Sequence, residues 1–144
     1  MKKFIAFCLA TIMVFCLCAC SNVSAMTDTE RASFQCFINS VKDPTSIILY
    51  GDILVVENTQ GTTLQFHYNA KNGFGAYVGN TVGQIHNVSG DILCCNEDSR
   101  YFIDMSWVTE PSGAQIAAEN NLTVRTISGE DVAEEFGLQW IALS

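Results

Sequence analysis

The sequence predicts an α+β domain in which an N-terminal helix packs on a mainly antiparallel sheet, with one or two short helices near the C-terminus. Two observations predict this class. Apolar residues recur at helical spacing soon after residue 29, and later runs alternate between apolar and polar residues with turn signals between them. No internal repeat divides residues 29–144, so we expect a single domain there.

The N-terminus has the pattern of a bacterial secretion signal. Lys2 and Lys3 precede an uncharged apolar stretch, residues 4–18, that is too short to cross a membrane comfortably. The segment Leu17-Cys18-Ala19-Cys20 resembles the bacterial lipobox, whose final cysteine receives diacylglycerol. Cys20 is therefore the predicted lipidation site.

A second cleavage site competes with this one. Val23-Ser24-Ala25 has the small-x-small form that an ordinary signal peptidase accepts, so a secreted protein cut after Ala25 is the alternative. The lipobox is favoured because its cysteine lies at the end of the apolar core. It predicts a signal peptide over 1–19, a lipidated tether over 20–28 and attachment to the outer face of the cell membrane.

The first predicted element of the domain is an amphipathic helix that ends before Pro44. Its buried face is marked by apolar residues at i, i+3, i+4 and i+7, namely Phe34, Phe37, Ile38 and Val41. Residues 47–56 are dense in β-formers and are interrupted by Gly51-Asp52, which predicts a kinked strand.

A hairpin partner follows the turn residues 58–61. Leu64, Phe66 and Tyr68 alternate with polar neighbours and predict a strand with one buried face. A second pair of strands is predicted over 91–95 and 101–108, because the latter segment alternates most regularly. The predicted core consists of Phe34, Phe37, Ile38, Leu64, Phe66, Ile103, Met105 and Trp107.

Three shorter elements complete the prediction. A short helix opens at Pro111-Ser112, and residues 122–127 alternate enough for an edge strand. A last helix has Ser128 as its N-cap and Gly137 as its stop.

One stretch of sequence is similar to known proteins. Asp43-Pro44 with Ser46, followed by Tyr68-x-Ala70-x-Asn72-x-Phe74-Gly75-x-Tyr77, resembles a group of small exported proteins and lipoproteins of Gram-positive bacteria, over about residues 30 to 90. The resemblance implies a bacterial protein directed to the cell surface. It carries no reaction that can be transferred to this chain.

The composition bears on partners and on cysteine chemistry. The net charge of −8 disfavours nucleic acid as a partner, since phosphate backbones repel an acidic chain. Cys36, Cys94 and Cys95 are odd in number, and adjacent cysteines on a strand point to opposite faces. Free thiols are expected, with a disulfide between Cys36 and Cys94 as the alternative.

Catalysis is not expected from these residues. His67 lies on the polar face of its predicted strand and His86 in a Gly/Asn-rich loop, and neither has a nucleophile motif or metal-ligand spacing around it. No cofactor motif appears in the sequence. A small thiol-dependent hydrolase that uses Cys94 or Cys95 is the alternative.

The aromatic residues Phe74 and Tyr77 are the candidate binding residues. Glycines beside them could project the rings into solvent to stack on a sugar or hold a partner segment, although a turn that tucks its rings over the sheet edge is the commoner arrangement. The sequence thus predicts a non-enzymatic binding or interaction module at the cell surface, with a protein, peptide or glycan as its partner.

Overall fold

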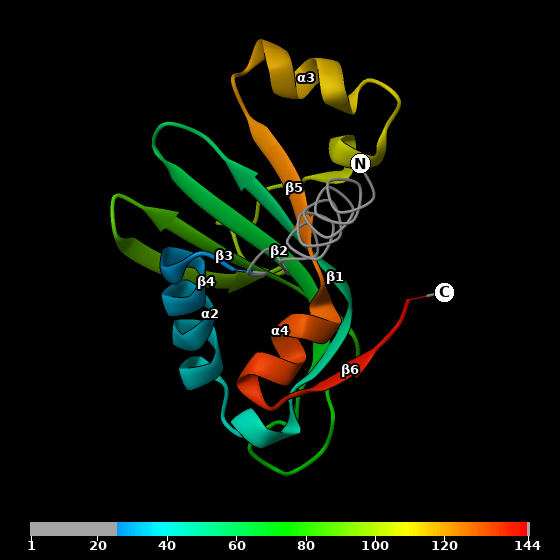
Figure 1. The fold of residues 1–144 in the computed structure, drawn as a ribbon. Coiled ribbons are helices and arrows are strands. Elements are labelled where there is room, and N and C mark those ends of the chain that lie inside the picture. Colours follow the sequence, from blue (N-terminus) through cyan, green and yellow to red (C-terminus); the bar gives the residue numbers. More distant parts are fainter. Residues whose placement is uncertain (1–25, 144) are drawn as a thin grey trace, which may run out of the picture.

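The computed structural model describes residues 26–143, in which a six-stranded sheet carries helices on both sides (Figure 1). The helices are α2 (Asp28–Ser40), α3 (Gly113–Glu119) and α4 (Gly129–Phe136). The strands are β1 (Ile48–Glu57), β2 (Gly61–Asn69), β3 (Thr81–Val88), β4 (Asp91–Asn96), β5 (Thr123–Ile127) and β6 (Gln139–Ile141). Short 3-10 turns occupy Pro44–Ser46 and Ser106–Thr109.

The sheet has the strand order β4-β3-β2-β1-β5, and every pair in it is antiparallel. Strand β6 adds a short parallel pairing to the start of β1. The predicted α+β class, with a helix before a mainly antiparallel sheet and short helices late in the chain, is confirmed.

Helix α2 begins with a capping box. Glu30 N donates to Thr27 Oγ1 at 3.2 Å, and Thr27 N donates to Glu30 Oε2 at 2.7 Å. Glu30 also pairs with Arg125 of β5, so one carboxylate joins the helix start to the sheet. Met26, which the sequence placed in the tether, is buried in the core.

The main core lies between the sheet and helices α2 and α4. Phe34 and Phe37 of α2 meet Phe66 of β2 with ring centroids 5.2 and 4.7 Å apart. These three rings are buried together with Ile38 and Leu64, as predicted.

Two glycines have the left-handed backbone that their positions require. Gly51, with φ +63°, lies where the register of β1 against β2 shifts between Tyr50 and Leu54, which is the predicted kink. Gly137, with φ +66°, ends α4, and Ser128 Oγ caps its start by accepting from Asp131 N at 3.2 Å.

The predicted strand over residues 101–108 is wrong. Strand β4 pairs instead with β3. The sequence did not predict β3 clearly, because residues 79–87 contain Gly and Asn, which are uncommon in strands. Residues 101–105 form no strand, and a 3-10 turn follows them. Of the three core residues predicted there, Met105 is buried, Trp107 is half-buried and Ile103 is 52% exposed.

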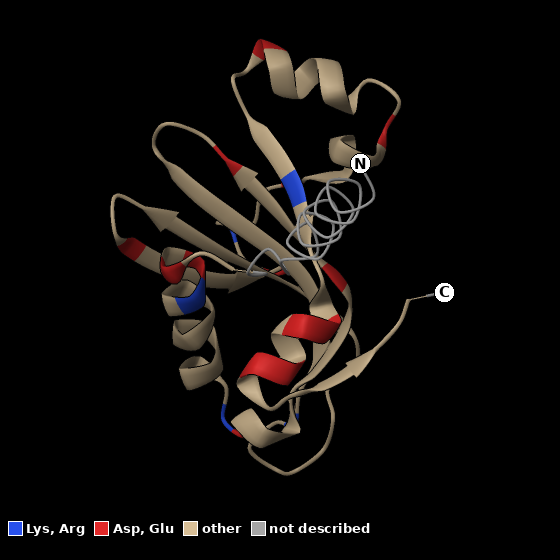
Figure 2. Ribbon diagram, viewed as in Figure 1, with Lys and Arg blue, Asp and Glu red and all other residues tan. Residues whose placement is uncertain are grey.

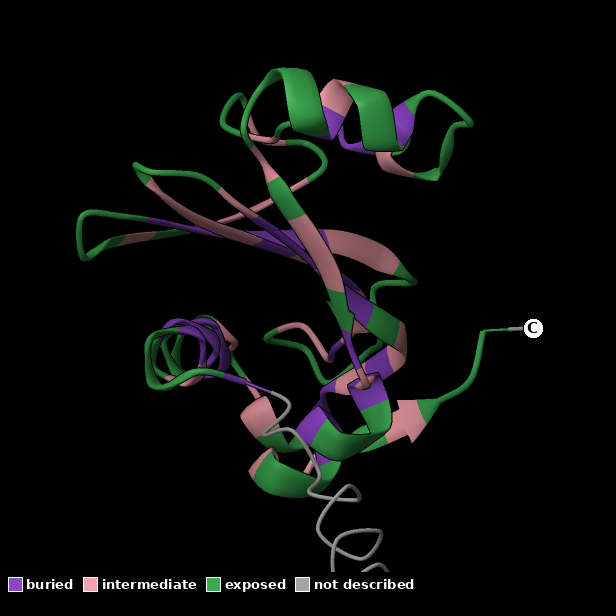
Figure 3. Ribbon diagram, turned by 45° about the horizontal axis from the view of Figure 1, so that its top comes forward, coloured by how far each residue is buried: buried purple, intermediate pink, exposed green. Residues whose placement is uncertain are grey.

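The two faces of the sheet are covered differently (Figure 3). We call the face under α2 and α4 the helix-covered face. The opposite side, the second face, lies under α3 and the irregular segment 97–112 that leads into it (Figures 1 and 3). Side chains alternate between these faces along each strand, so each strand contributes to both.

Acidic residues are spread along the chain, most visibly in α4, and basic residues are few (Figure 2). Within residues 26–143, no helix combines the length and the apolar character that a membrane span requires.

Candidate ligand-binding site

A cavity of about 460 Å³ opens on the second face of the sheet. We call it the second-face cavity. Its floor comes from strands β1 to β4 and its wall from the segment that leads into α3, together with Leu122 just before β5. It is lined by Val56, Asn58, Gln60, Gly61, Thr62, Thr63, His86, Val88, Leu93, Tyr101, Ile103, Met105, Trp107 and Leu122.

The wall is held in place by polar side chains of β3 rather than by strand pairing. Gln84, fully buried, donates from Nε2 to the carbonyl of Ile103 at 2.6 Å, and Ile103 N donates to Gln84 Oε1 at 2.9 Å. Gln84 Nε2 also donates to Gln65 Oε1 at 2.7 Å. A side-chain amide thus takes the place of a strand backbone opposite Ile103.

His86 holds the wall at Tyr101, two residues before Ile103. Its Nε2 lies 3.1 Å from the carbonyl oxygen of Tyr101, and its Nδ1 lies 3.0 Å from Thr63 Oγ1. A carbonyl can only accept, so the network assigns the proton of the neutral ring to Nε2, and Nδ1 accepts from the Thr63 hydroxyl. Burial lowers the pKa of His86, and the Tyr101 carbonyl offsets part of that shift.

The lining contains no Asp, Glu, Lys or Arg, although the protein as a whole is strongly acidic. Because the pKa of His86 is lowered, its ring is neutral at pH 7 and the cavity is uncharged. Most of the lining is apolar or aromatic, while amides and hydroxyls gather near the β1–β2 turn. Such a cavity can hold a neutral ligand with an apolar body and a polar edge.

Apolar side chains also surround the mouth of this cavity. Val88, Leu93, Tyr101 and Ile103 are each exposed by about half or slightly less. The guanidinium of Arg100 lies 4.7 Å from the ring centroid of Tyr101, so it covers one face of that ring. Four large exposed apolar residues around one cavity form the kind of patch that marks a binding site.

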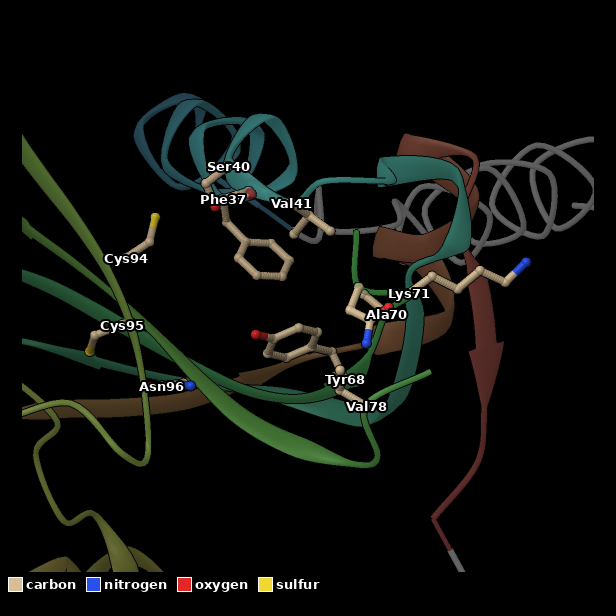
Figure 4. A pocket seen from close by; sticks show the side chains of 11 residues that line it. Phe37, Ser40, Val41, Tyr68, Ala70, Lys71, Val78, Cys94, Cys95 and Asn96 are labelled. Carbon is tan, nitrogen blue, oxygen red and sulfur yellow. Dashed lines mark hydrogen bonds between the residues drawn. The ribbon is translucent and has the colours of Figure 1, made fainter. Parts of the chain in front are cut away.

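A second cavity, of about 340 Å³, lies between the C-terminal half of α2 and the sheet (Figure 4). We call it the helix-side cavity. The Phe37 and Tyr68 rings lie at its centre with their centroids 5.0 Å apart, and Lys71 and Asn96 lie at its margin. The side chain of Cys94 points toward α2, whereas that of Cys95 points away from the helix.

Cys95 instead lies on the second face, where its Sγ is 3.5 Å from His86 Nε2. The sequence did not predict this contact, because His86 was expected in a loop; it is a buried residue of β3, and that expectation was wrong. His67 lies on the second face of β2, opposite Tyr50 and Val82. The expected alternation of Cys94 and Cys95 between faces is present.

The candidate binding residues Phe74 and Tyr77 lie in the loop between β2 and β3. Neither residue lines the second-face cavity. Phe74 is 99% exposed and Tyr77 43%, so the expectation that these rings tuck over the sheet edge is wrong for Phe74. Asn72 Oδ1 accepts from Phe74 N at 2.9 Å and from Ala76 N at 3.2 Å, which presents the Phe74 ring on a hydrogen-bonded turn.

Comparison with protein-family models, with curated proteins and with solved structures finds no match to this chain. The site is therefore interpreted from its own geometry. Among residues 26–143, no cluster of three His, Cys, Asp or Glu side chains is arranged to hold a metal ion.

Proposed function

We propose that this protein is a bacterial surface lipoprotein, anchored in the membrane through Cys20, that binds an uncharged ligand in the second-face cavity and catalyses no reaction. The lipobox-like segment and the resemblance to small exported proteins of Gram-positive bacteria support the anchoring. The cavity supports the binding role, because it is large enough for a small molecule or part of a glycan.

One observation carries the binding proposal: the second-face cavity contains no permanently charged side chain in a protein whose net charge is −8. A charged ligand would lose its hydration there without gaining an ion pair, which is unfavourable. A neutral ligand would instead bury its apolar body against Leu93, Ile103 and Trp107.

The binding proposal can be tested with two neutral probes. N-phenyl-1-naphthylamine is neutral and apolar, and its fluorescence rises in an apolar site; chitotriose is a neutral glycan and competes if the site prefers sugars. We expect the purified protein to bind at least one of them saturably. Replacing Leu93 with Arg, which puts a charge at the mouth, should weaken that binding about tenfold or more.

Val78→Arg is the matched control. Val78 is also an exposed apolar residue, but it lines the helix-side cavity. Equal loss of probe binding in both variants, or no saturable binding of either probe, would contradict the proposed site. Preserved binding in Val78→Arg with loss in Leu93→Arg would support it.

The anchor is tested separately. Cys20 lies outside the described residues, so this part of the proposal depends on the sequence alone. Two acyl chains, at about 0.8 kcal/mol per buried methylene, would hold the protein on the membrane. We expect Cys20→Ser to release the protein into the medium or to leave it unprocessed; unchanged membrane fractionation and gel migration would instead favour cleavage after Ala25.

The contact between Cys95 and His86 favours the alternative of a thiol hydrolase, but the hydrogen bonds around it do not. In the tautomer that the Tyr101 carbonyl selects, Nε2 holds a proton and has no lone pair to accept one from Cys95. An activated pair would have a lowered thiol pKa and a raised imidazole pKa. Here burial raises the pKa of Cys95 and lowers that of His86.

A further inference from the structure

Helix α2 is fixed over the β3–β4 hairpin by one buried hydrogen bond. Asn87 Nδ2, on the helix-covered face of β3, donates to Ser33 Oγ of α2 at 2.9 Å. Asn87 is paired with Ile92 across the hairpin, and Ile85 with Cys94. Ser33 therefore marks the position on α2 that lies above Asn87 and Ile92.

Helix α2 crosses β3 and β4 on this face and contacts both strands. Cys36 follows Ser33 by about 4.5 Å along the same side of the helix, and Cys94 follows Ile92 by about 6.7 Å on the same face of the strand. One turn later, Ser40 and Asn96 line the helix-side cavity together. Cys36 of α2 therefore lies next to Cys94 of β4, and the two side chains are in contact.

The side chains of Cys36 and Cys94 agree with this placement. Cys94 points from β4 toward α2 (Figure 4). Burial, followed by the charge and the side-chain contact of the neighbouring Cys36 thiol, raises the pKa of Cys94 to about 12. Cys36 itself is exposed, so it can react with a dissolved oxidant.

We propose that Cys36 and Cys94 form a disulfide that joins helix α2 to the edge strand β4 once the chain meets an oxidising environment. The relevance of this cross-link in cells rests on the proposed export, because exported bacterial proteins leave the reducing cytoplasm. Cys95 is excluded as the partner since its side chain lies on the opposite face of the sheet.

The oxidant is a small disulfide such as oxidised glutathione. The exposed Cys36 thiolate attacks one of its sulfurs, and the first glutathione thiolate leaves and takes up a proton. Cys94 then loses its proton to water and attacks Cys36 Sγ, which releases the second glutathione. The two cysteines lose two electrons and two protons, and one oxidised glutathione becomes two reduced molecules.

The test uses the purified full chain, incubated with oxidised or reduced glutathione, alkylated with iodoacetamide and digested with trypsin without reduction. We expect the peptides 32–42 and 72–100 to be linked after oxidation, with Cys95 alkylated. The linked pair should persist in Cys95→Ser and disappear in Cys94→Ser, which are matched single-atom changes. The melting temperature should fall by roughly 10 °C on reduction in the parent and remain unchanged by reductant in Cys36→Ser.

The cross-link is refuted if Cys36 and Cys94 are both alkylated after oxidation, or if the linked pair survives in Cys94→Ser. Cell fractionation reads out the proposed export independently. A chain that stays in the cytoplasm but forms the linked pair in glutathione would refute export and support the cross-link. A chain found on the cell surface whose Cys36 and Cys94 thiols stay free in oxidised glutathione would support export and refute the cross-link.

Discussion

The two faces of the sheet are built by different means. On the helix-covered face, the rings of Phe34, Phe37 and Phe66 fill most of the space between regular elements, and the helix-side cavity opens only toward the C-terminal half of α2. On the second face, an irregular segment is held by the side chains of Gln84 and His86, and a cavity remains beside it. A core of interlocking rings stabilises the fold, whereas a face covered by an irregular segment on a few hydrogen bonds leaves a larger space for a ligand.

The largest expected effect tests this difference directly. Phe66→Ala should lower the free energy of unfolding by about 3–5 kcal/mol, because it leaves a cavity in a closed core. Trp107→Ala should cost only about 1–2 kcal/mol, because the Trp107 ring is half-buried beside an existing cavity. Urea denaturation of both variants measures the two losses. Equal losses would mean that the second face is packed as closely as the helix-covered face.

The same difference explains which parts of the fold the sequence could predict. On the helix-covered face, the helical spacing of Phe34, Phe37 and Ile38 and the alternation of Leu64 and Phe66 are direct consequences of burial against one apolar surface. Capping residues such as Ser128 and Gly137 act locally, so they too can be recognised from sequence.

The second face could not be predicted in this way. Residues 101–108 alternate as a strand would, but the main chain of Ile103 finds its partner in the Gln84 side chain, which is distant in sequence. Alternation records which side chains are buried and not which backbone is paired. A usable signal existed in β3, where Gln84 and His86 are two residues apart and therefore share a face.

The candidate site was missed for the same reason. Its lining comes from four strands and from the segment that the sequence assigned to a fifth, so no local motif contains it. The sequence instead pointed to Phe74 and Tyr77, whose glycine-flanked turn is a local feature.

A second prediction concerns the hydrogen bonds that hold the second face. The pKa of folded His86 is lowered by burial, whereas an unfolded histidine has a pKa of about 6.5. As the pH falls below about 6.5, the unfolded chain binds a proton that folded His86 does not, so the stability due to neutral His86 is present above this pH and is lost as pH falls through the folded pKa. His86→Gln should therefore flatten the fall in stability between about pH 7 and pH 5.

Urea denaturation at several pH values measures this slope. His67→Gln, which leaves His86 and both of its hydrogen-bond partners in place, is the matched control and should keep the slope of the parent. An unchanged slope in His86→Gln would mean that the ring is more hydrated than its hydrogen bonds to Thr63 and Tyr101 indicate. The second face would then be open to water beneath its wall.

The smallest effect is expected at Phe74, in the loop between β2 and β3, because this ring contributes to neither face. Phe74→Ser should change the free energy of unfolding by less than about 0.5 kcal/mol, because the ring is 99% exposed and buries almost nothing on folding. Asn72→Ala should cost about 1 kcal/mol, because its side chain accepts the hydrogen bonds that shape the turn. Thermal or urea denaturation distinguishes the two. A large loss in Phe74→Ser would show that the ring packs against the protein in solution. A negligible loss means that the ring does nothing for folding, so any change in surface binding by Phe74→Ser could be assigned to the ring itself and not to unfolding.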